Sequence, residues 1–230
     1  MPADHDLRQA LIDVRKAYRL IWLYQRRAVD IIKLINKAFG HKFYVWETED
    51  SIGKMPGQKT TDPFGDNKWI WSTLPLYRMS LLYLPPSLEP NRQIMGEWMC
   101  EIFVETDTGF SENEDETEPA PANFTPADES NTFLRLYAWY CTQDGTLNWF
   151  DGIWNEMDGP EQDDEVTAEH PNVPIKILRK SFELSKLNDE PSVERAIGEF
   201  KSALSQHFEV IFSGSPPSND PEPSSIRLRG

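Results

Sequence analysis

The sequence predicts an α+β domain, with a long N-terminal helix, an antiparallel sheet of about five strands and a C-terminal helix. Three observations predict this class. Apolar residues recur at helical spacing near both ends of the chain, and they alternate with polar residues in between. Helices and strands are segregated along the chain and do not alternate, and the strands follow one another in meander-like pairs. This arrangement is typical of an antiparallel sheet.

The N-terminal helix is predicted over residues 6–39, where apolar residues keep spacings of three and four and no Gly or Pro occurs before Gly40. The stripe consists of Leu7, Leu11, Val14, Tyr18, Ile21, Ala28, Ile32, Ile35 and Phe39, with Gln25 in its one polar slot. Such a helix is roughly 50 Å long at 1.5 Å per residue. That exceeds the needs of a domain of this size, so residues 1–40 are expected to pack on the domain, to project or kink, or to pair with a second copy.

Basic side chains form a second stripe beside the apolar one, within about 20° of one line on a helical projection. They are Arg8, Arg15, Arg19, Arg26, Lys33 and Lys37. Three interpretations stay open. The stripe is a solvated face, it pairs with the acidic part of the same chain, or it contacts an external anion such as nucleic acid or a membrane surface.

The central segments have the period of two and the β-branched and aromatic content of strands. Strands are predicted at residues 43–48, 68–73, 76–84, 97–105 and 133–141. The Asp144-Gly145 dipeptide predicts a tight hairpin that returns through residues 147–154. Residues 175–187 are compatible with a strand or a helix.

The second helix is expected to open between Asn188 and Ser192, with Pro191 in its first turn. Its apolar stripe is Val193, Ala196, Ile197, Phe200, Ala203, Leu204 and Phe208. Acidic loops are expected near 111–131 and 155–174, a turn-rich loop at 51–66 and a flexible tail at 213–230. The α+β domain itself is expected to cover residues 41–212.

Charge is divided unevenly along the chain. Residues 1–45 hold nine Lys or Arg and four Asp or Glu, whereas residues 46–230 carry a net charge of −20. The overall charge of −15 argues against stand-alone nucleic-acid binding, because phosphates would be repelled. Neither a secretory signal nor a membrane-spanning run is predicted. Cys100 and Cys141 are expected to be small buried residues, so a cytoplasmic protein is predicted.

The predicted sheet supplies further candidate contact residues. Glu97, Glu101 and Glu105 share one face of their strand, and three carboxylates there are expected to be exposed to water. Tyr137 and Trp139 share a face with Arg135, and an exposed aromatic face with an arginine suits a protein contact.

These patterns favour a non-enzymatic interaction module, an adaptor, inhibitor or assembly subunit, which uses the acidic and aromatic sheet surface and the basic-striped helix. The partner is expected to be a protein with a basic surface, or a second copy through the N-terminal helix, so a homo-oligomer is possible. No catalytic residue, metal site or cofactor is predicted.

Two alternatives stay open. One is a metal-dependent hydrolase or nuclease that uses the strand carboxylates, with acids near the predicted hairpin. These acids are Asp144, Asp151, Glu156 and Asp158. The other is a small-molecule sensor with an aromatic pocket.

Overall fold

Two long helices and a five-stranded antiparallel sheet make up the part of the chain that the computed structural model describes, residues 4–48, 76–110, 120–167, 172–208, 210 and 212. The elements are α1 (Asp4–Phe39), β1 (Lys42–Thr48), β2 (Arg78–Leu84), β3 (Trp98–Glu105), β4 (Phe133–Cys141), β5 (Ile175–Glu183) and α2 (Glu190–Phe208). Short 3₁₀ helices lie at Pro121–Asn123, Trp154–Glu156 and Leu184–Lys186. The predicted α+β class is confirmed.

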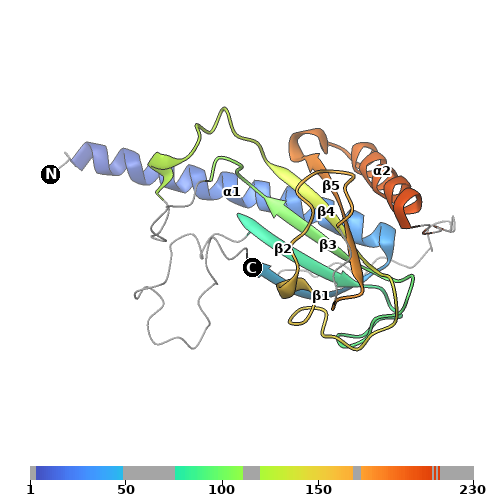
Figure 1. Ribbon diagram of the computed structural model, residues 1–230. Helices are drawn as coiled ribbons and strands as arrows, with labels where there is room; N and C mark the ends of the chain where they lie inside the picture. The colour runs from blue at the N-terminus through green and yellow to red at the C-terminus, as the bar shows by residue number, and fades with distance from the viewer. Residues whose placement is uncertain are drawn as a thin grey trace, which may run out of the picture.

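The strands form a meander in the order β1-β2-β3-β4-β5, and each strand runs antiparallel to the next (Figure 1). The prediction for residues 133–141 is confirmed as β4, and β1, β2 and β3 begin within two residues of their predicted starts. The ambiguous segment is a strand, β5, followed by a 3₁₀ turn. The predicted strand at 68–73 and the loop at 51–66 lie outside the described residues, as do 111–119 and the tail at 213–230.

The predicted hairpin at Asp144-Gly145 is wrong. Gly145 instead exchanges two backbone hydrogen bonds with Gln93, at 2.9 and 3.1 Å, and the residues after it form turns. The Asn148 carboxamide oxygen accepts hydrogen bonds from the backbone N–H of Phe150 and of Asp151, at 2.9 and 2.8 Å. Such local bonds compete with a strand ladder, so the segment folds back on itself instead of pairing.

Both helices lie on one face of the sheet, and a hydrophobic core separates them from the strands (Figure 1). This core joins Ile31 and Ile35 of α1, Phe200 of α2 and the inward residues of β3, among them Ile102. Trp98, Cys100, Ile102 and Val104 alternate along β3, and all four belong to this core. The opposite face carries a second core, which loops cover with Trp149 and Ile153.

Local hydrogen bonds cap the N-terminal end of α2 and the C-terminal end of α1. At the start of α2, the Asp189 carboxylate accepts a hydrogen bond from the Ser192 N–H at 2.8 Å, and the Ser192 hydroxyl accepts one from the Asp189 N–H at 3.1 Å. This reciprocal cap satisfies N–H groups that the first turn leaves without partners. At the end of α1, Gly40 takes a φ of +68° and donates to the Asn36 carbonyl at 2.8 Å. The predicted stop at Gly40 is confirmed.

Candidate interaction surface

The two halves of α1 have different surroundings. Ala28, Ile32 and Ile35 are buried between the sheet and α2, whereas every residue from 7 to 23 except the half-buried Ile12 is exposed. Figure 1 shows α1 continuing beyond the strands toward the N-terminus. The apolar stripe of the helix runs through both halves without a change of spacing. We call its exposed part, Leu7, Leu11, Val14, Tyr18 and Ile21, the α1 seam.

Large hydrophobic side chains on and around the α1 seam are open to solvent. Their exposed fractions run from 37% at Ile21 to 69% at Tyr18. Trp22 lies beside the seam and is 56% exposed, and Leu20 and Leu23 lie on the other side of the helix and are also exposed. These last three were not identified from the sequence, because they fall outside the three-and-four spacing. Residues 18–23 are therefore hydrophobic almost all the way round.

Polar contacts fix α1 to the domain at the point where it leaves the sheet. The Tyr24 hydroxyl lies 2.7 Å from the Thr106 hydroxyl, and the Arg27 guanidinium donates to the Leu187 carbonyl at 2.5 Å. Burial raises the pKa of Tyr24, so its hydroxyl stays neutral and able to donate. These bonds hold the helix axis just before its buried half begins.

The basic stripe of α1 faces solvent. All six of its side chains, Arg8, Arg15, Arg19, Arg26, Lys33 and Lys37, are exposed. The Arg26 guanidinium lies 5.4 Å from the centre of the Trp22 ring, in a cation–π arrangement. Among the described residues none of the six forms an ion pair, so the structure gives no support for pairing with the acidic part of the same chain.

The predicted exposure of the acidic face of β3 is wrong for two of its three carboxylates. Glu101 is 5% exposed and Glu105 is 7% exposed, whereas Glu97, which immediately precedes β3, is half-buried. Glu101 accepts a hydrogen bond from the Ser80 hydroxyl and another from the Trp139 indole N–H, the latter at 2.8 Å. A carboxylate supplied with such donors no longer needs water, which permits its burial.

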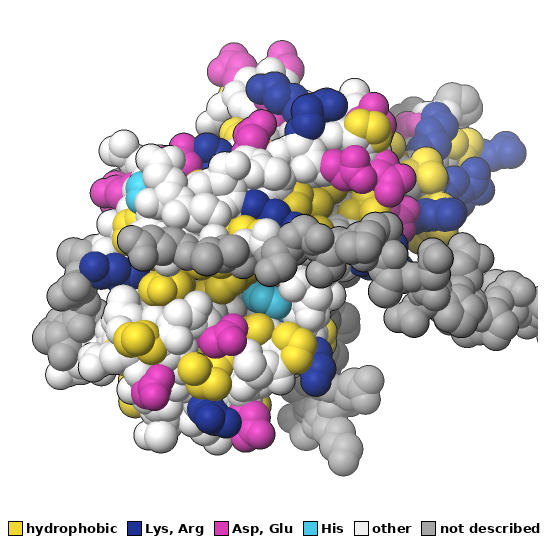
Figure 2. Space-filling view, turned by 90° about the vertical axis from the view of Figure 1, so that its right-hand side faces the viewer, with side chains coloured by type: hydrophobic (Ala, Val, Ile, Leu, Met, Phe, Trp, Pro, Cys, Tyr) yellow, Lys and Arg dark blue, Asp and Glu magenta, His cyan; other side chains and the backbone are white. Residues whose placement is uncertain are grey.

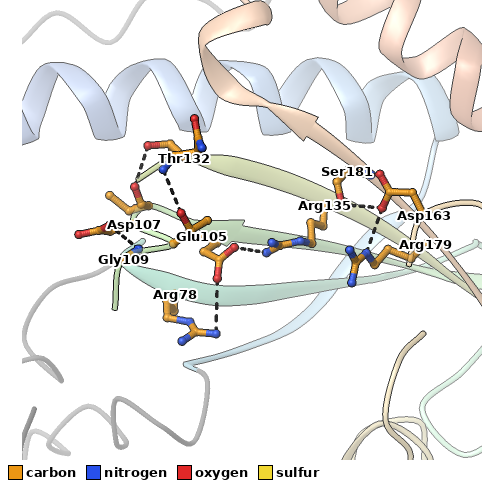
Figure 3. Close-up of polar contacts among 12 residues, drawn as sticks. Arg78, Glu105, Asp107, Gly109, Thr132, Arg135, Asp163, Arg179 and Ser181 are labelled. Carbon is orange, nitrogen blue, oxygen red and sulfur yellow. Dashed lines mark hydrogen bonds and ion pairs between the residues drawn. The ribbon is translucent and has the colours of Figure 1, made fainter. Parts of the chain in front are cut away.

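Glu105 lies between two arginines of the neighbouring strands (Figure 3). Its carboxylate is 3.5 Å from the Arg78 guanidinium and makes a closer ion pair with Arg135. The strand register produces this cluster, because Arg78 pairs directly with Glu105, and Arg135 lies on the same face of β4, two residues beyond Phe133, which pairs with Glu105. The Arg135 guanidinium also lies 5.2 Å from the centre of the Phe133 ring.

Polar contacts across the sheet continue from the Arg78–Glu105–Arg135 cluster onto β5. There Asp163 accepts hydrogen bonds from Arg179 and from the backbone and hydroxyl of Ser181 (Figure 3). These contacts lower the pKa of Asp163 although burial opposes the shift. The acidic segment predicted as a loop near 155–174 is thus attached to β5 over part of its length.

The structure therefore brings the predicted sheet residues together as an internal network. Trp139 is only 2% exposed, and burial raises the pKa of the half-buried Tyr137 to about 12. Together with Glu101, Glu105 and Arg135, these residues connect strands. They do not offer a large free surface to a partner.

A hollow of about 460 Å³ lies at the C-terminal end of α1. Its lining consists of Phe39, His41, Gly96, Glu97, Trp98, Tyr140, Phe208, Val210 and Phe212. Figure 2 looks onto this end of the molecule and shows hydrophobic side chains among acidic and basic ones. The chain's own groups already engage these rings. The Lys201 ammonium lies 5.7 Å from Phe39 and 5.2 Å from Phe212, and Tyr140 stacks on Phe208 at 4.5 Å.

His41, in this hollow, makes folding dependent on pH. Burial lowers the pKa of its imidazole from 6.5 to about 4. His41 is therefore protonated near pH 6.5 in the unfolded chain but only near pH 4 in the folded chain. Its contribution to stability is retained above pH 6.5 and is lost as the pH falls from 6.5 toward 4. We expect His41 to reduce the free energy of unfolding by about 2 kcal/mol between pH 7 and pH 5.

Urea titrations of the wild type and of His41→Gln at both pH values measure this contribution. The carboxylates titrate alike in the two chains, so the wild type should lose about 2 kcal/mol more than the variant over this interval. Equal losses in both chains would show that His41 is protonated in the folded state as easily as in the unfolded one.

Among the described residues, the metal-ligating side chains form no candidate metal site and both cysteine thiols are buried. No group of three His, Cys, Asp or Glu side chains among them is placed to hold a metal ion. Cys100 and Cys141 are both buried, as predicted. Burial raises the pKa of the Cys141 thiol to about 12 and that of Cys100 still higher, so both stay protonated near neutral pH. None of the helices described is long and apolar enough to cross a membrane.

Comparison with known proteins places both halves of α1 and the whole described sheet within one family match. A family model described as PM0109 matches residues 4–210. The uncharacterized protein PM0109 of Pasteurella multocida (strain Pm70) is 25% identical over 207 residues, which cover 88% of this chain and 96% of the relative. No solved structure matches the chain.

Proposed function

The chain belongs to the PM0109 family, and we propose that it is a non-enzymatic interaction module that binds a helical partner through the α1 seam. The observation that carries the proposal is the exposure of this seam on a helix whose other half is buried along the same stripe. The sheet residues Glu101, Glu105 and Trp139 are left out of the proposed surface because they are buried.

An exposed hydrophobic row of this kind has an energetic cost that a partner would remove. Single surface leucines are ordinary, but contiguous apolar surface on one helix is typical of an interaction site. Burying a large apolar side chain completely contributes about 1.5–3 kcal/mol. A helix segment with no tertiary packing is also marginal in water, so residues 7–23 would gain helical stability from a partner.

The spacing of the α1 seam favours another helix as its partner. Alternating steps of three and four residues give a strict seven-residue repeat, which keeps a seam toward one neighbouring helix in a left-handed supercoil. Two further features favour a protein partner over a membrane surface for residues 7–23. Residues 18–23 are hydrophobic almost all round, and residues 46–230, with a net charge of −20, would be repelled by an anionic membrane surface.

A seam variant and a matched control test the proposal. The seam variant carries Leu11→Glu and Ile21→Glu. The control carries Lys16→Glu, which changes the net charge equally on the opposite side of the helix, and glutamate is a good helix former at all three positions. We expect complexes that form in the native host to be lost from the seam variant and kept by the control.

The measurement is native purification after mild cross-linking, with the mass of each complex determined by light scattering and its components by mass spectrometry. Copies of the chain itself are counted among the components. Complexes of equal yield and composition from wild type and seam variant would contradict the proposal.

A further inference from the structure

We propose that a second copy of this chain occupies the α1 seam, with the two projecting helices paired antiparallel. This inference rests on the proposed function and assigns its partner. The arrangement has two-fold symmetry and closes on itself, as most homodimers do.

The exposed surface is large enough for such a pair. The five seam residues and Trp22 are each between about a third and two thirds exposed. Counting roughly 100 Å² for each gives roughly 600 Å² per copy, and roughly 1,200 Å² for the pair. A specific interface needs about 1,000 Å² in total.

The α1 seam is complementary to the α1 seam of a second copy that runs in the opposite direction. With the two-fold axis crossing the α1 seam at the level of residue 16, Leu11 of one copy meets Ile21 of the second copy, and Val14 meets Tyr18 of the second copy. Ala17 lies next to the axis, where a small side chain lets the two backbones approach closely. Arg8 would reach Trp22 of the second copy and repeat the cation–π arrangement that Arg26 makes with Trp22 within the chain.

Charge selects the antiparallel arrangement over the parallel one. Residues 7–23 hold four Lys or Arg and one Asp, whereas residues 46–230 carry a net charge of −20. Antiparallel pairing lays the basic half-helix of each copy toward the acidic body of the other, which is attractive. Parallel pairing would put the two acidic bodies side by side.

The oligomeric state of the full chain tests the pairing. We expect sedimentation velocity over a concentration series to show a monomer–dimer equilibrium, weakened at least tenfold more in the seam variant than in the Lys16→Glu control, which measures the effect of the same change in charge. Both variants should keep the wild-type unfolding midpoint at dilution, which excludes misfolding as the cause. Raising the salt concentration should weaken the wild-type dimer, because the attraction between basic helix and acidic body is screened.

A disulfide experiment tests the direction. Chains carrying Leu11→Cys and chains carrying Ile21→Cys, with tags of different size, are mixed and mildly oxidised; Cys100 and Cys141 are buried and do not react. We expect the mixed disulfide dimer to predominate. Disulfides between like chains only would overturn the antiparallel arrangement.

The outcomes separate this inference from the proposed function. A chain that is monomeric at every concentration, yet forms a seam-dependent complex with another protein, overturns the second copy and leaves the proposed function standing. Seam-dependent binding to anionic phospholipid vesicles by a monomeric chain would assign the seam to a membrane surface and overturn both. Absence of any seam-dependent complex also overturns both.

Discussion

Replacement of Glu105 by glutamine is expected to lower the free energy of unfolding by about 3 kcal/mol. The Glu105 carboxylate is buried between Arg78 and Arg135, whose side chains are each 16% exposed. Glutamine keeps the size and removes the charge, so two partly buried guanidinium groups lose the counter-charge that compensates their desolvation. Urea denaturation at pH 7 measures the loss.

A surface pair provides the control for this prediction. Lys180 and Asp164 are 2.6 Å apart, but the aspartate side chain is 49% exposed, so Asp164→Asn is expected to cost less than about 1 kcal/mol. If the two substitutions cost the same, the Glu105 cluster is solvated in solution and does not hold the strands together. The loss should also depend little on salt, because a buried cluster is weakly screened.

The alternation of apolar and polar residues was sufficient to predict most of the sheet. β4 follows its predicted bounds because both of its faces carry strand-forming side chains and no competing turn signal. The hairpin prediction failed one segment later. There the Asn148 side chain accepts a hydrogen bond from the turn that follows it, and Trp149 is fully buried in the second core. The Asp144-Gly145 dipeptide alone indicates neither of these contacts.

The interaction surface was only partly predictable for a related reason. The α1 stripe could be identified from its spacing, but its division into buried and exposed halves depends on where the sheet ends. Residue type alone predicts that Glu101 and Glu105 are exposed. Their burial depends on Ser80, Arg78 and Arg135, which only the strand register brings beside them. A single sequence does not contain that register explicitly.

Two isoleucines of α1, two heptads apart on the same stripe, test whether the helix projects. Ile35 is 1% exposed in the core and Ile21 is 37% exposed in the α1 seam. We expect Ile35→Ala to cost about 3 kcal/mol at any protein concentration, because it leaves a cavity between α1 and the sheet. Ile21→Ala should cost less than about 1 kcal/mol in dilute solution.

Concentration then separates packing within a copy from packing between copies. The cost of Ile21→Ala should grow as the protein is concentrated, since dimerisation stabilises only the folded state by mass action and the substitution weakens the dimer. The cost of Ile35→Ala should change far less. Urea denaturation of both variants and the wild type at two widely separated concentrations measures this. A cost for Ile21→Ala as large as that for Ile35→Ala in dilute solution would mean that residues 7–23 pack on their own domain, and the α1 seam would then have no free face to offer a second copy.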